Sequence, residues 1–444
     1  MTTPEQEPTA AAPESGEPEH VAGWGRRLLD IYTVETTPVV TVLAIFFALV
    51  VGAILIVLSD PATMGKAGYF FSSPSDFLSG AWGDISNAYS NLFKGAIFDP
   101  KTLNGTPGQF FGPITNTLEF ASPLIFGGLA VSVAFRAGMF NIGGQGQTIG
   151  GAILSAWVAF SWTSLPGPLH LAIAILAGLL GGLVYGGVVG WLKAKRGTHE
   201  VIVTIMLNYV ASLFLINWLL NASGFHDASK AGQPISKPAD PNSVLPHLFG
   251  DQLNTDIGLV LALLATAAVA WFFKRSTLGF EVRAVGLNAH AARTAGIDVG
   301  RVQIAAMVIS GALMGMIGVT QVLGLANPSN NAVTPTIDAG LGFTSITVSL
   351  LGRTKPWGVV WAALLFGAFQ AGGAIMQTQG VPQVSNEIIT VLEALIVIFV
   401  AAPRLIREVF RLRSKHRHDA DAPGAGGLPP GVPGAHTTVA GGQI

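Results

Sequence analysis

The sequence predicts an all-α, polytopic integral membrane protein, and three observations carry that prediction. Half of the 444 residues are hydrophobic and 11% are charged, whereas a soluble domain carries roughly 25% charged residues. Unbroken apolar runs recur along the chain, many of them close to the ~20 residues that a helix needs to cross a bilayer. The alternating strands of about ten residues that build an outer-membrane barrel are missing from the sequence, which excludes that architecture.

Ten apolar runs predict about ten transmembrane helices. Nine runs are continuous, and the run at 334–351 is shorter and is interrupted by Gly340 and Gly342. The other nine cover 38–58, 114–135, 142–162, 170–192, 200–221, 256–273, 302–324, 357–376 and 386–402. Together they predict one membrane domain over 38–410, with both termini on the same side.

The distribution of Lys and Arg agrees with ten crossings. Under that count, 19 of the 24 basic residues fall on one side, and the other side holds five, all of them Lys. Cytoplasmic loops are enriched in Lys and Arg. We therefore expect both termini to be cytoplasmic, and without the run at 334–351 Arg353 and Lys355 would move outside.

The segments between and beyond the runs differ in composition. Residues 1–30 are rich in Pro and Glu, and residues 416–444 are rich in Gly, Pro and Ala, so both are predicted to be disordered cytoplasmic tails. In the extracytoplasmic segment 59–113, apolar and aromatic residues recur near helical spacing. This spacing predicts one or two short amphipathic helices at the outer surface, with a plain connecting loop as the alternative.

The stretch "FNIGGQGQTIGG" at 140–151 is unusually polar for a chain in a bilayer. An amide without a hydrogen-bond partner in hydrocarbon costs several kcal/mol, so these side chains should face protein or water. Neutral amides beside a glycine-rich backbone suit the passage of a polar, uncharged solute, and the alternative is that they only link helices. We expect the translocation path to include Asn141, Gln145, Gln147, Asn208, Thr344 and Ser345.

Two segments of the sequence resemble each other weakly. "AGMFNIGGQG" opens the third run and "AGLGFTSITV" opens the eighth, five runs later. Because five is odd, two such halves would have opposite orientations, as in the inverted five-helix repeats of many transporters. Chance similarity is the alternative.

The segment 275–301 joins the sixth and seventh runs on the cytoplasmic side. Its "HAARTAG" places small residues at Ala291, Ala292 and Ala295 on a short helix that would fit a groove on a partner. Gly296 would end this helix as a C′ residue in the left-handed conformation. The alternative is an ordinary basic cytoplasmic loop.

Three carboxylates occur in or near the apolar runs. Glu393 lies in the middle of the last run, where an ionisable side chain is by default a functional-site hypothesis. Glu119 is expected in the first turn of the second run, close to the outer surface, where solvation suffices. Glu200 is expected at the inner start of the fifth run.

Four stretches, in this order, carry a resemblance to a known family: "FNIGGQGQ", "THEVIVTIMLNY", "FEVRAVGLNAHAARTAGI" and "GFTSITVSLLGRTKPWGV". Together they resemble ABC importer permeases of the branched-chain amino acid/ribose/nucleoside class. The chain is most similar to the nucleoside-uptake subfamily that works with a basic-membrane-protein type lipoprotein. The resemblance covers about residues 38–410.

The resemblance implies a multi-pass permease in the cell membrane of a prokaryote that moves nucleosides, most of all purine nucleosides, inward by alternating access. It implies three partners: a cytoplasmic tandem-domain ATPase, a second permease subunit, and an extracytoplasmic substrate-binding lipoprotein. The ATPase would dock on the loop at 275–301, with Arg283, Gly286, Asn288, Ala291, Ala292, Arg293 and Gly296 as the coupling residues.

The resemblance also implies a non-catalytic subunit without a cofactor. The sequence agrees, because no G-x-x-x-x-G-K-[ST] motif occurs and the chain has no Cys. It offers no metal-ligand cluster. Two alternatives stay open: a permease for ribose or another simple sugar, and an ion-coupled secondary transporter that would use Glu393 and Glu119.

Overall fold

The structure is a computed structural model that describes residues 37–103, 105–230, 232–250, 252–325, 331–379 and 386–401. The two predicted tails, 1–30 and 416–444, lie outside these residues. The chain divides into two units, Met1–Ala44 with Ala402–Ile444, and Ile45–Ala401. The second unit contains nearly all of the described residues.

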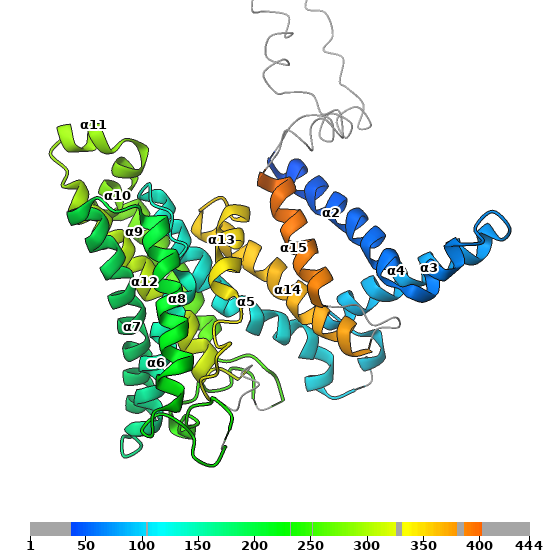
Figure 1. Ribbon diagram of the computed structural model, residues 1–444, viewed down its shortest axis with the longest axis horizontal. Coiled ribbons are helices and arrows are strands. Elements are labelled where there is room, and N and C mark those ends of the chain that lie inside the picture. The colour runs from blue at the N-terminus through cyan, green and yellow to red at the C-terminus, as the bar shows by residue number, and fades with distance from the viewer. Residues whose placement is uncertain are drawn as a thin grey trace, which may run out of the picture. The chain divides into compact units, whose positions relative to one another are not determined.

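The regular elements of the described residues are helices, beside two isolated β-bridges (Figure 1). Each of the ten predicted runs contains one. They are α2 (Thr37–Ser59), α5 (Pro107–Arg136), α6 (Gly144–Ser161), α7 (Gly167–Arg196), α8 (Glu200–Asn217), α9 (Gly258–Arg275), α12 (Val299–Leu323), α13 (Leu341–Leu351), α14 (Pro356–Gln379) and α15 (Asn386–Ala401).

Seven of the described helices are long and apolar enough to cross a membrane: α2, α5, α7, α8, α9, α12 and α14. The chain is therefore a polytopic, all-helical membrane protein. Of the other three, α6 has 18 residues and a polar start, α15 has 16 described residues, and α13 has 11.

The run at 334–351 is helical only in its second part. At 1.5 Å per residue, α13 is about 16 Å long, which is about half of a hydrocarbon core. The preceding backbone takes left-handed angles at Ala339 (φ 46°) and Gly340 (φ 73°), so a helix cannot begin earlier. Beyond α13, the Thr354 carbonyl accepts a hydrogen bond from Arg136 Nε at 3.0 Å, which places the ends of α13 and α5 side by side.

The segment 59–113 contains α3 (Pro61–Ala67), α4 (Pro74–Ala96), a short 3-10 helix (Pro100–Thr102) and the first turns of α5. Asp60 begins α3 by accepting hydrogen bonds from the N–H groups of Ala62 and Thr63. The second helix has 23 residues and packs against α14, where Gly95 lies against Ile375. It is thus longer than the short helices that the sequence predicts there.

The tightest helix pair is α7 with α12. A methyl group on Gly182 would overlap the backbone of Gly311 and Gly315, and one on Gly186 would overlap the carbonyl of Met307. Small residues four apart let two helix backbones approach closely in lipid. The glycine series of α7 therefore fixes α12 against it, and α6 packs on the same pair through Gly151.

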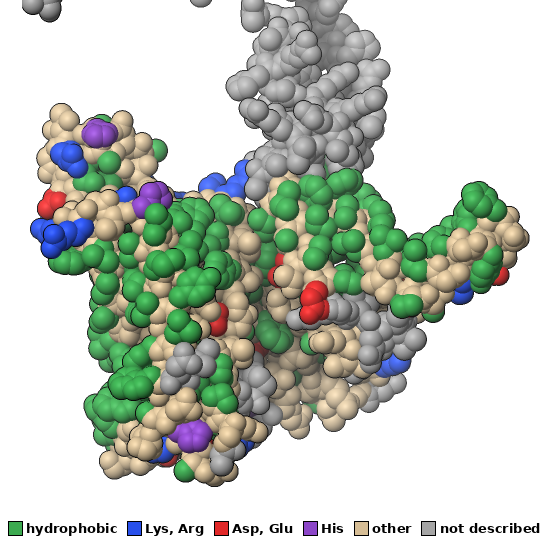
Figure 2. All heavy atoms as spheres, viewed as in Figure 1, with side chains coloured by type: hydrophobic (Ala, Val, Ile, Leu, Met, Phe, Trp, Pro, Cys, Tyr) green, Lys and Arg blue, Asp and Glu red, His purple; other side chains and the backbone are tan. Residues whose placement is uncertain are grey.

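Most described basic residues lie at one end of these helices, which we call the basic end. It includes the last turns of α5, α7 and α9, together with α10 (Thr277–Leu287) and α11 (Ala289–Thr294). Figure 2 shows Lys and Arg side chains gathered around α10 and α11, and hydrophobic side chains over much of the face formed by α6, α7 and α8. The basic residues of this end are Arg136, Lys193, Lys195, Arg196, Lys274, Arg275, Arg283, Arg293, Arg301, Arg353 and Lys355.

Candidate translocation site

Two interrupted helix starts meet inside the helical body. A methyl group on Gly144, the first residue of α6, would lie 2.9 Å from the backbone of Gly342 in the first turn of α13. Each helix follows a non-helical stretch, 137–143 before α6 and 331–340 before α13. These are the two weakly similar segments of the sequence, and paired half-helices are typical of transporter binding sites.

Asn141, three residues before the start of α6, is the centre of a buried hydrogen-bond network. Its Nδ2 donates to Gln147 Oε1 at 2.9 Å and to Ser310 Oγ of α12 at 2.8 Å. Its Oδ1 accepts from the Gly143 N–H at 2.9 Å and from Gln147 Nε2 at 3.2 Å. Ser310 in turn donates to the Ala130 carbonyl of α5. Because Asn141, Gln147 and Ser310 are fully buried, this network links α5, α6 and α12.

Asn208 and Ser345 also make contacts within the helical body. Asn208 of α8 accepts from the Gly146 N–H and donates to the Ile142 carbonyl, both at 2.9 Å. The Ser345 hydroxyl donates to the Leu341 carbonyl at 2.6 Å and packs against Gly127 of α5. Both side chains are buried, and these hydrogen bonds provide their polar atoms with protein partners.

Gln145 and Thr344 differ from those four residues because their side chains are only half-buried. Gln145, in the first turn of α6, hydrogen-bonds the buried carboxyl group of Asp338. Thr344, in the first turns of α13, donates to the Gly340 carbonyl at 3.3 Å. Asp338 was missed from the sequence, although it is an ionisable residue inside an apolar run, which is the usual signal of an intramembrane site.

A cavity of about 380 Å³ opens beside the start of α13. One wall comes from α5, with Glu119, Phe120, Pro123 and Leu124, and the others from α12, α14 and the residues around the start of α13. Phe120 is 37% exposed, and Gln321 and Gln370 are half-buried. The polar residues that line the cavity are Glu119, Thr320, Gln321, Thr344 and Gln370. The sequence predicted Thr344 as a path residue and indicated Glu119 as a carboxylate near an apolar run.

The structure corrects the position of Glu119. The helix α5 begins at Pro107, seven residues before the predicted run, because Thr106 and Gln109 form a capping box and Pro107 occupies the first turn. Glu119 therefore lies several turns inside the helix and is 7% exposed, rather than solvated in the first turn.

Glu119 meets a second buried acid, Asp256, which the sequence analysis also missed. The Asp256 N–H donates to Glu119 Oε2 at 3.2 Å, and the two carboxyl groups are hydrogen-bonded to each other. Such a bond requires one proton between them. Burial raises the pKa of Asp256 above its ordinary value of 3.8, although the N–H groups of Gly258 and Leu325 oppose that rise.

Glu393, the intramembrane carboxylate predicted in the last run, is 6% exposed within α15. Its Oε1 accepts a hydrogen bond from Gln370 Nε2 of α14 at 3.0 Å. Since Gln370 lines the cavity, Glu393 lies directly behind the cavity wall. Glu200, at the start of α8, pairs with Lys193 at 2.8 Å.

At the basic end, the segment 275–301 forms α10 and α11. Asn288 caps α11 by accepting the N–H groups of His290 and Ala291, both at 3.0 Å. Gly296 ends α11 with φ 85°, and the bonds Gly296 N–H to Arg293 carbonyl and Ile297 N–H to Ala292 carbonyl complete a Schellman motif. The predicted left-handed C′ glycine is thus confirmed.

Of the predicted coupling residues, six are exposed, and Ala292 is buried against its own chain; the six are Arg283, Gly286, Asn288, Ala291, Arg293 and Gly296. Leu287, which the sequence analysis missed, is 89% exposed. An apolar side chain that protrudes to this extent between two helices is suited to a partner's surface.

The comparisons with known proteins place the chain in a family. The family model for the permease component of branched-chain amino acid transport systems matches residues 114–401. The chain therefore belongs to this family of ABC transporter permeases. It is a non-catalytic membrane subunit. Membership of this family implies an ATPase and a binding protein as partners. Family membership sets the ion-coupled alternative aside.

Three curated relatives match 70% or more of this chain. The chain is 35% identical to the nucleoside ABC transporter permease protein NupB of Lactococcus lactis subsp. cremoris over 74% of this chain and 86% of the relative. It is 37% identical to the guanosine ABC transporter permease protein NupP of Bacillus subtilis over 70% and 87%. It is 31% identical to the glucose ABC transporter permease protein TsgB13 of Haloferax volcanii over 90% and 97%. No solved structure matches the chain.

Proposed function

We propose that this chain is the larger permease subunit of an ABC importer that moves nucleosides, above all purine nucleosides, into the cell. The lining of the cavity beside α13 carries this proposal. An aromatic face, two neutral amides, two hydroxyls and a carboxyl group surround a space of about 380 Å³, which falls within the usual range of ligand pockets. Nucleosides combine a flat base with sugar hydroxyls, and this set of groups complements both.

Each part of the substrate has a partner in the lining. Phe120 offers a ring for the base, because every base has a π-face that stacks on an aromatic side chain. Gln321, Gln370 and Thr344 supply neutral donors and acceptors for the base edge and the ribose. Neutral groups bind such a solute without holding it too tightly to leave.

Among the six predicted path residues, Thr344 would then face the substrate directly, and Gln145 would act indirectly. The other four, Asn141, Gln147, Asn208 and Ser345, would keep the helix starts in place. Gln145 would act through Asp338, because the residue after Asp338, Ala339, lines the cavity. The path would run from this cavity along the junction of α6 and α13.

The basic end would be cytoplasmic and would receive a tandem-domain ATPase at α10 and α11. Leu287 would insert into the ATPase, while Arg283, Asn288, Ala291, Arg293 and Gly296 would surround it. A second, shorter permease would complete the pore, and a lipoprotein would deliver the substrate at the opposite end. Alternating access would move α6 and α13 against α5 and α12.

Glucose or another simple sugar is the second candidate substrate. The glucose permease relative matches 90% of this chain, and the amides and carboxyl group of the cavity would serve sugar hydroxyls as well. Phe120 separates the two candidates, because a base stacks on the ring face while a sugar gains less from it.

Uptake in cells with and without this gene tests the proposal. We would follow labelled guanosine, adenosine, uridine, ribose and glucose, with ATP depleted or with the proton gradient dissipated. The proposal expects loss of ATP-dependent nucleoside uptake. Phe120→Leu should then reduce nucleoside uptake, and Phe111→Leu, on the same helix outside the cavity, is the matched control. Loss of glucose uptake alone would move the substrate to sugars.

A further inference from the structure

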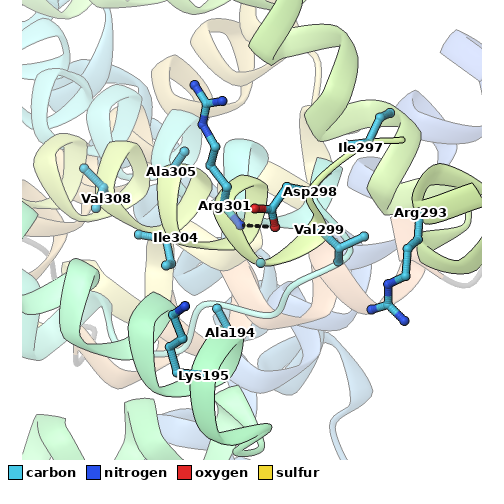
Figure 3. Close-up of a pocket in the computed structure, with 11 residues that line it drawn as sticks. Ala194, Lys195, Arg293, Ile297, Asp298, Val299, Arg301, Ile304, Ala305 and Val308 are labelled. Atoms are coloured by element: carbon cyan, nitrogen blue, oxygen red, sulfur yellow. Dashed lines mark hydrogen bonds between the residues drawn. The ribbon is translucent and has the colours of Figure 1, made fainter. Parts of the chain in front are cut away.

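A second cavity, of about 590 Å³, opens at the basic end where α7 ends and α12 begins (Figure 3). Its lining lies outside the translocation path, but it shares Arg293 with the proposed ATPase contact and includes residues 297–301 of the segment 275–301. We propose that this cavity binds one anionic phospholipid from the bilayer leaflet at the basic end. The site is independent of the substrate proposed above.

The mouth of the cavity is positively charged. Lys195 lies in the last turn of α7, Arg293 in α11 and Arg301 in the first turn of α12, and all three are exposed. Figure 3 shows Lys195 projecting toward Ile304, Arg293 beyond Val299, and the Arg301 side chain pointing away from Lys195. Basic pockets between transmembrane helices bind anionic lipid head groups.

One acidic side chain faces this mouth without neutralising it. Asp298 Oδ1 accepts the backbone N–H of Arg301 at 3.1 Å, so this carboxylate caps α12. Among the residues that the structure describes, no ion pair within 4.0 Å joins Lys195, Arg293 or Arg301 to an acidic side chain. Three cations against one capped carboxylate leave an excess of positive charge for a phosphate group.

The floor of the cavity is apolar and follows α12 away from the charged mouth. It is formed by Ile304, Ala305 and Val308 of α12. Val308 lies nine residues beyond Val299, which corresponds to about 13 Å along the helix. The cavity therefore joins a charged mouth to a hydrocarbon-facing wall, which is the distribution of polarity along one phospholipid.

Outside the cavity, α7 carries an exposed apolar face that ends at Lys195. Val184, Val188 and Trp191 are 58%, 43% and 48% exposed. Together with Lys195 they follow the spacing of a single helix face. Trp marks the level of the membrane interface, and Lys195 lies one turn beyond it, at head-group depth. An acyl chain would lie along the α12 floor while its phosphate contacts Lys195 and Arg293.

An acidic loop of a soluble partner would satisfy the charged mouth but not the apolar floor. Such a loop would have to bring polar backbone groups to the depth of Val308, where each unsatisfied group costs several kcal/mol. A phospholipid avoids this cost because its tail is apolar. The combination of both surfaces in one cavity favours the lipid.

Binding of phosphatidylglycerol to the purified full-length chain tests this inference. A fluorescent phosphatidylglycerol would be titrated into the protein in phosphatidylcholine micelles, with glycerol phosphate as a soluble competitor. Lys195→Gln with Arg293→Gln should weaken binding by about fivefold for each charge removed. Lys274→Gln with Arg275→Gln removes two exposed charges from the same end, outside the cavity, and should leave the affinity unchanged.

A second variant tests the apolar floor. Ala305→Trp fills it while keeping every charge, and should also weaken lipid binding, with thermal melting as the check on folding. Equal affinity for phosphatidylglycerol and phosphatidylcholine would overturn the inference. So would equal effects of the two charge pairs, or displacement of the lipid by glycerol phosphate at similar affinity, which would indicate a site for a free phosphate.

Discussion

Gly286 of α10 lies against the backbone of Arg136, the last residue of α5: a methyl group on Gly286 would overlap the Arg136 carbonyl oxygen. Arg136 is itself fixed, because its guanidinium lies 4.4 Å from the centre of the Phe273 ring and donates to the Thr354 carbonyl. The chain continues from Arg136 through Gly138 to Asn141. Seven residues of backbone, 137–143, connect Arg136 to the start of α6, and a displacement of α10 would reach α6 through them.

This contact predicts that Gly286→Ala weakens coupling between the ATPase and transport. The added methyl group would push α10 away from Arg136 and change the coupling free energy by about 0.5–2 kcal/mol, a loss of about two- to thirtyfold. Substrate-stimulated ATP hydrolysis by the reconstituted complex measures it. Gly83→Ala, where no atom lies within 4 Å of the added group, is the control, and equal hydrolysis by both variants would contradict the contact's role.

Two adjacent glycines of α7 test the helix packing. A methyl group on Gly186 would overlap the Met307 carbonyl, whereas one on Gly187 would have its nearest neighbour, Val308 Cγ2, at 3.4 Å. We expect Gly186→Ala to lower the stability by about 1–3 kcal/mol and Gly187→Ala to leave it nearly unchanged. Thermal melting in detergent compares them. Identical melting temperatures would show that α7 and α12 are not held by this contact.

Asn141 and Gln145 are both amides of the same stretch, but we predict opposite consequences of replacing them. Asn141→Leu leaves Gln147, Ser310 and the Gly143 N–H without their buried partner, which should cost about 1–3 kcal/mol for each unsatisfied group and destabilise the protein. Gln145→Leu should lower the melting temperature much less, because its partner Asp338 keeps the Gly340 N–H, and it should change uptake. If Gln145→Leu also destabilised the protein as strongly, Gln145 would be a packing residue like Asn141.

The acid pair predicts a falling stability with rising pH. Because burial raises the pKa of Asp256, the folded protein holds this proton at pH values where the unfolded chain has lost it. The contribution to stability is complete below the ordinary value of 3.8 and is lost as the pH rises through the folded pKa. Melting temperatures measured over this range should flatten in Asp256→Asn.

Asp227→Asn is the control for this pH series. A side-chain hydrogen bond from Ser229 lowers the pKa of Asp227 below 3.8, so the sign of its effect is reversed: its contribution is present above 3.8 and is lost as the pH falls through the folded value. Removing Asp227 should therefore not flatten the fall above pH 3.8. A fall of equal slope in Asp256→Asn would contradict the shared proton.

Much of the fold follows from hydrophobicity alone, because each apolar run contains a helix close to its predicted bounds. The predicted helix starts were wrong where capping or turn residues, and not hydropathy, determine the first residue of the helix. Thr106 and Gln109 start α5 seven residues early, which buries Glu119, and the left-handed backbone at Ala339 and Gly340 delays α13. Both features have sequence signals, a capping box and an Asp-x-Gly turn, but hydropathy does not register them.

The roles of the polar residues could not be separated from the sequence. Asn141, Gln145 and Gln147 lie within seven residues of one another. Asn141 is buried and hydrogen-bonds Ser310, 169 residues later, whereas Gln145 is half-buried. Asp256 and Glu119 are likewise 137 residues apart. Contacts of such long range depend on how helices pack, and one sequence does not contain that information in readable form.

Protection of position 344 by substrate tests whether the cavity beside α13 holds the substrate, because the chain has no Cys and a single one can be introduced. Thr344→Cys and Ser345→Cys would be treated with a membrane-impermeant thiol reagent in the reconstituted complex, with and without guanosine. We expect the cysteine at 344 to react and to be protected by guanosine, while the buried neighbour at 345 stays unreactive. Equal reaction at both positions, or reaction at 344 that guanosine leaves unchanged, would contradict a substrate path through this cavity.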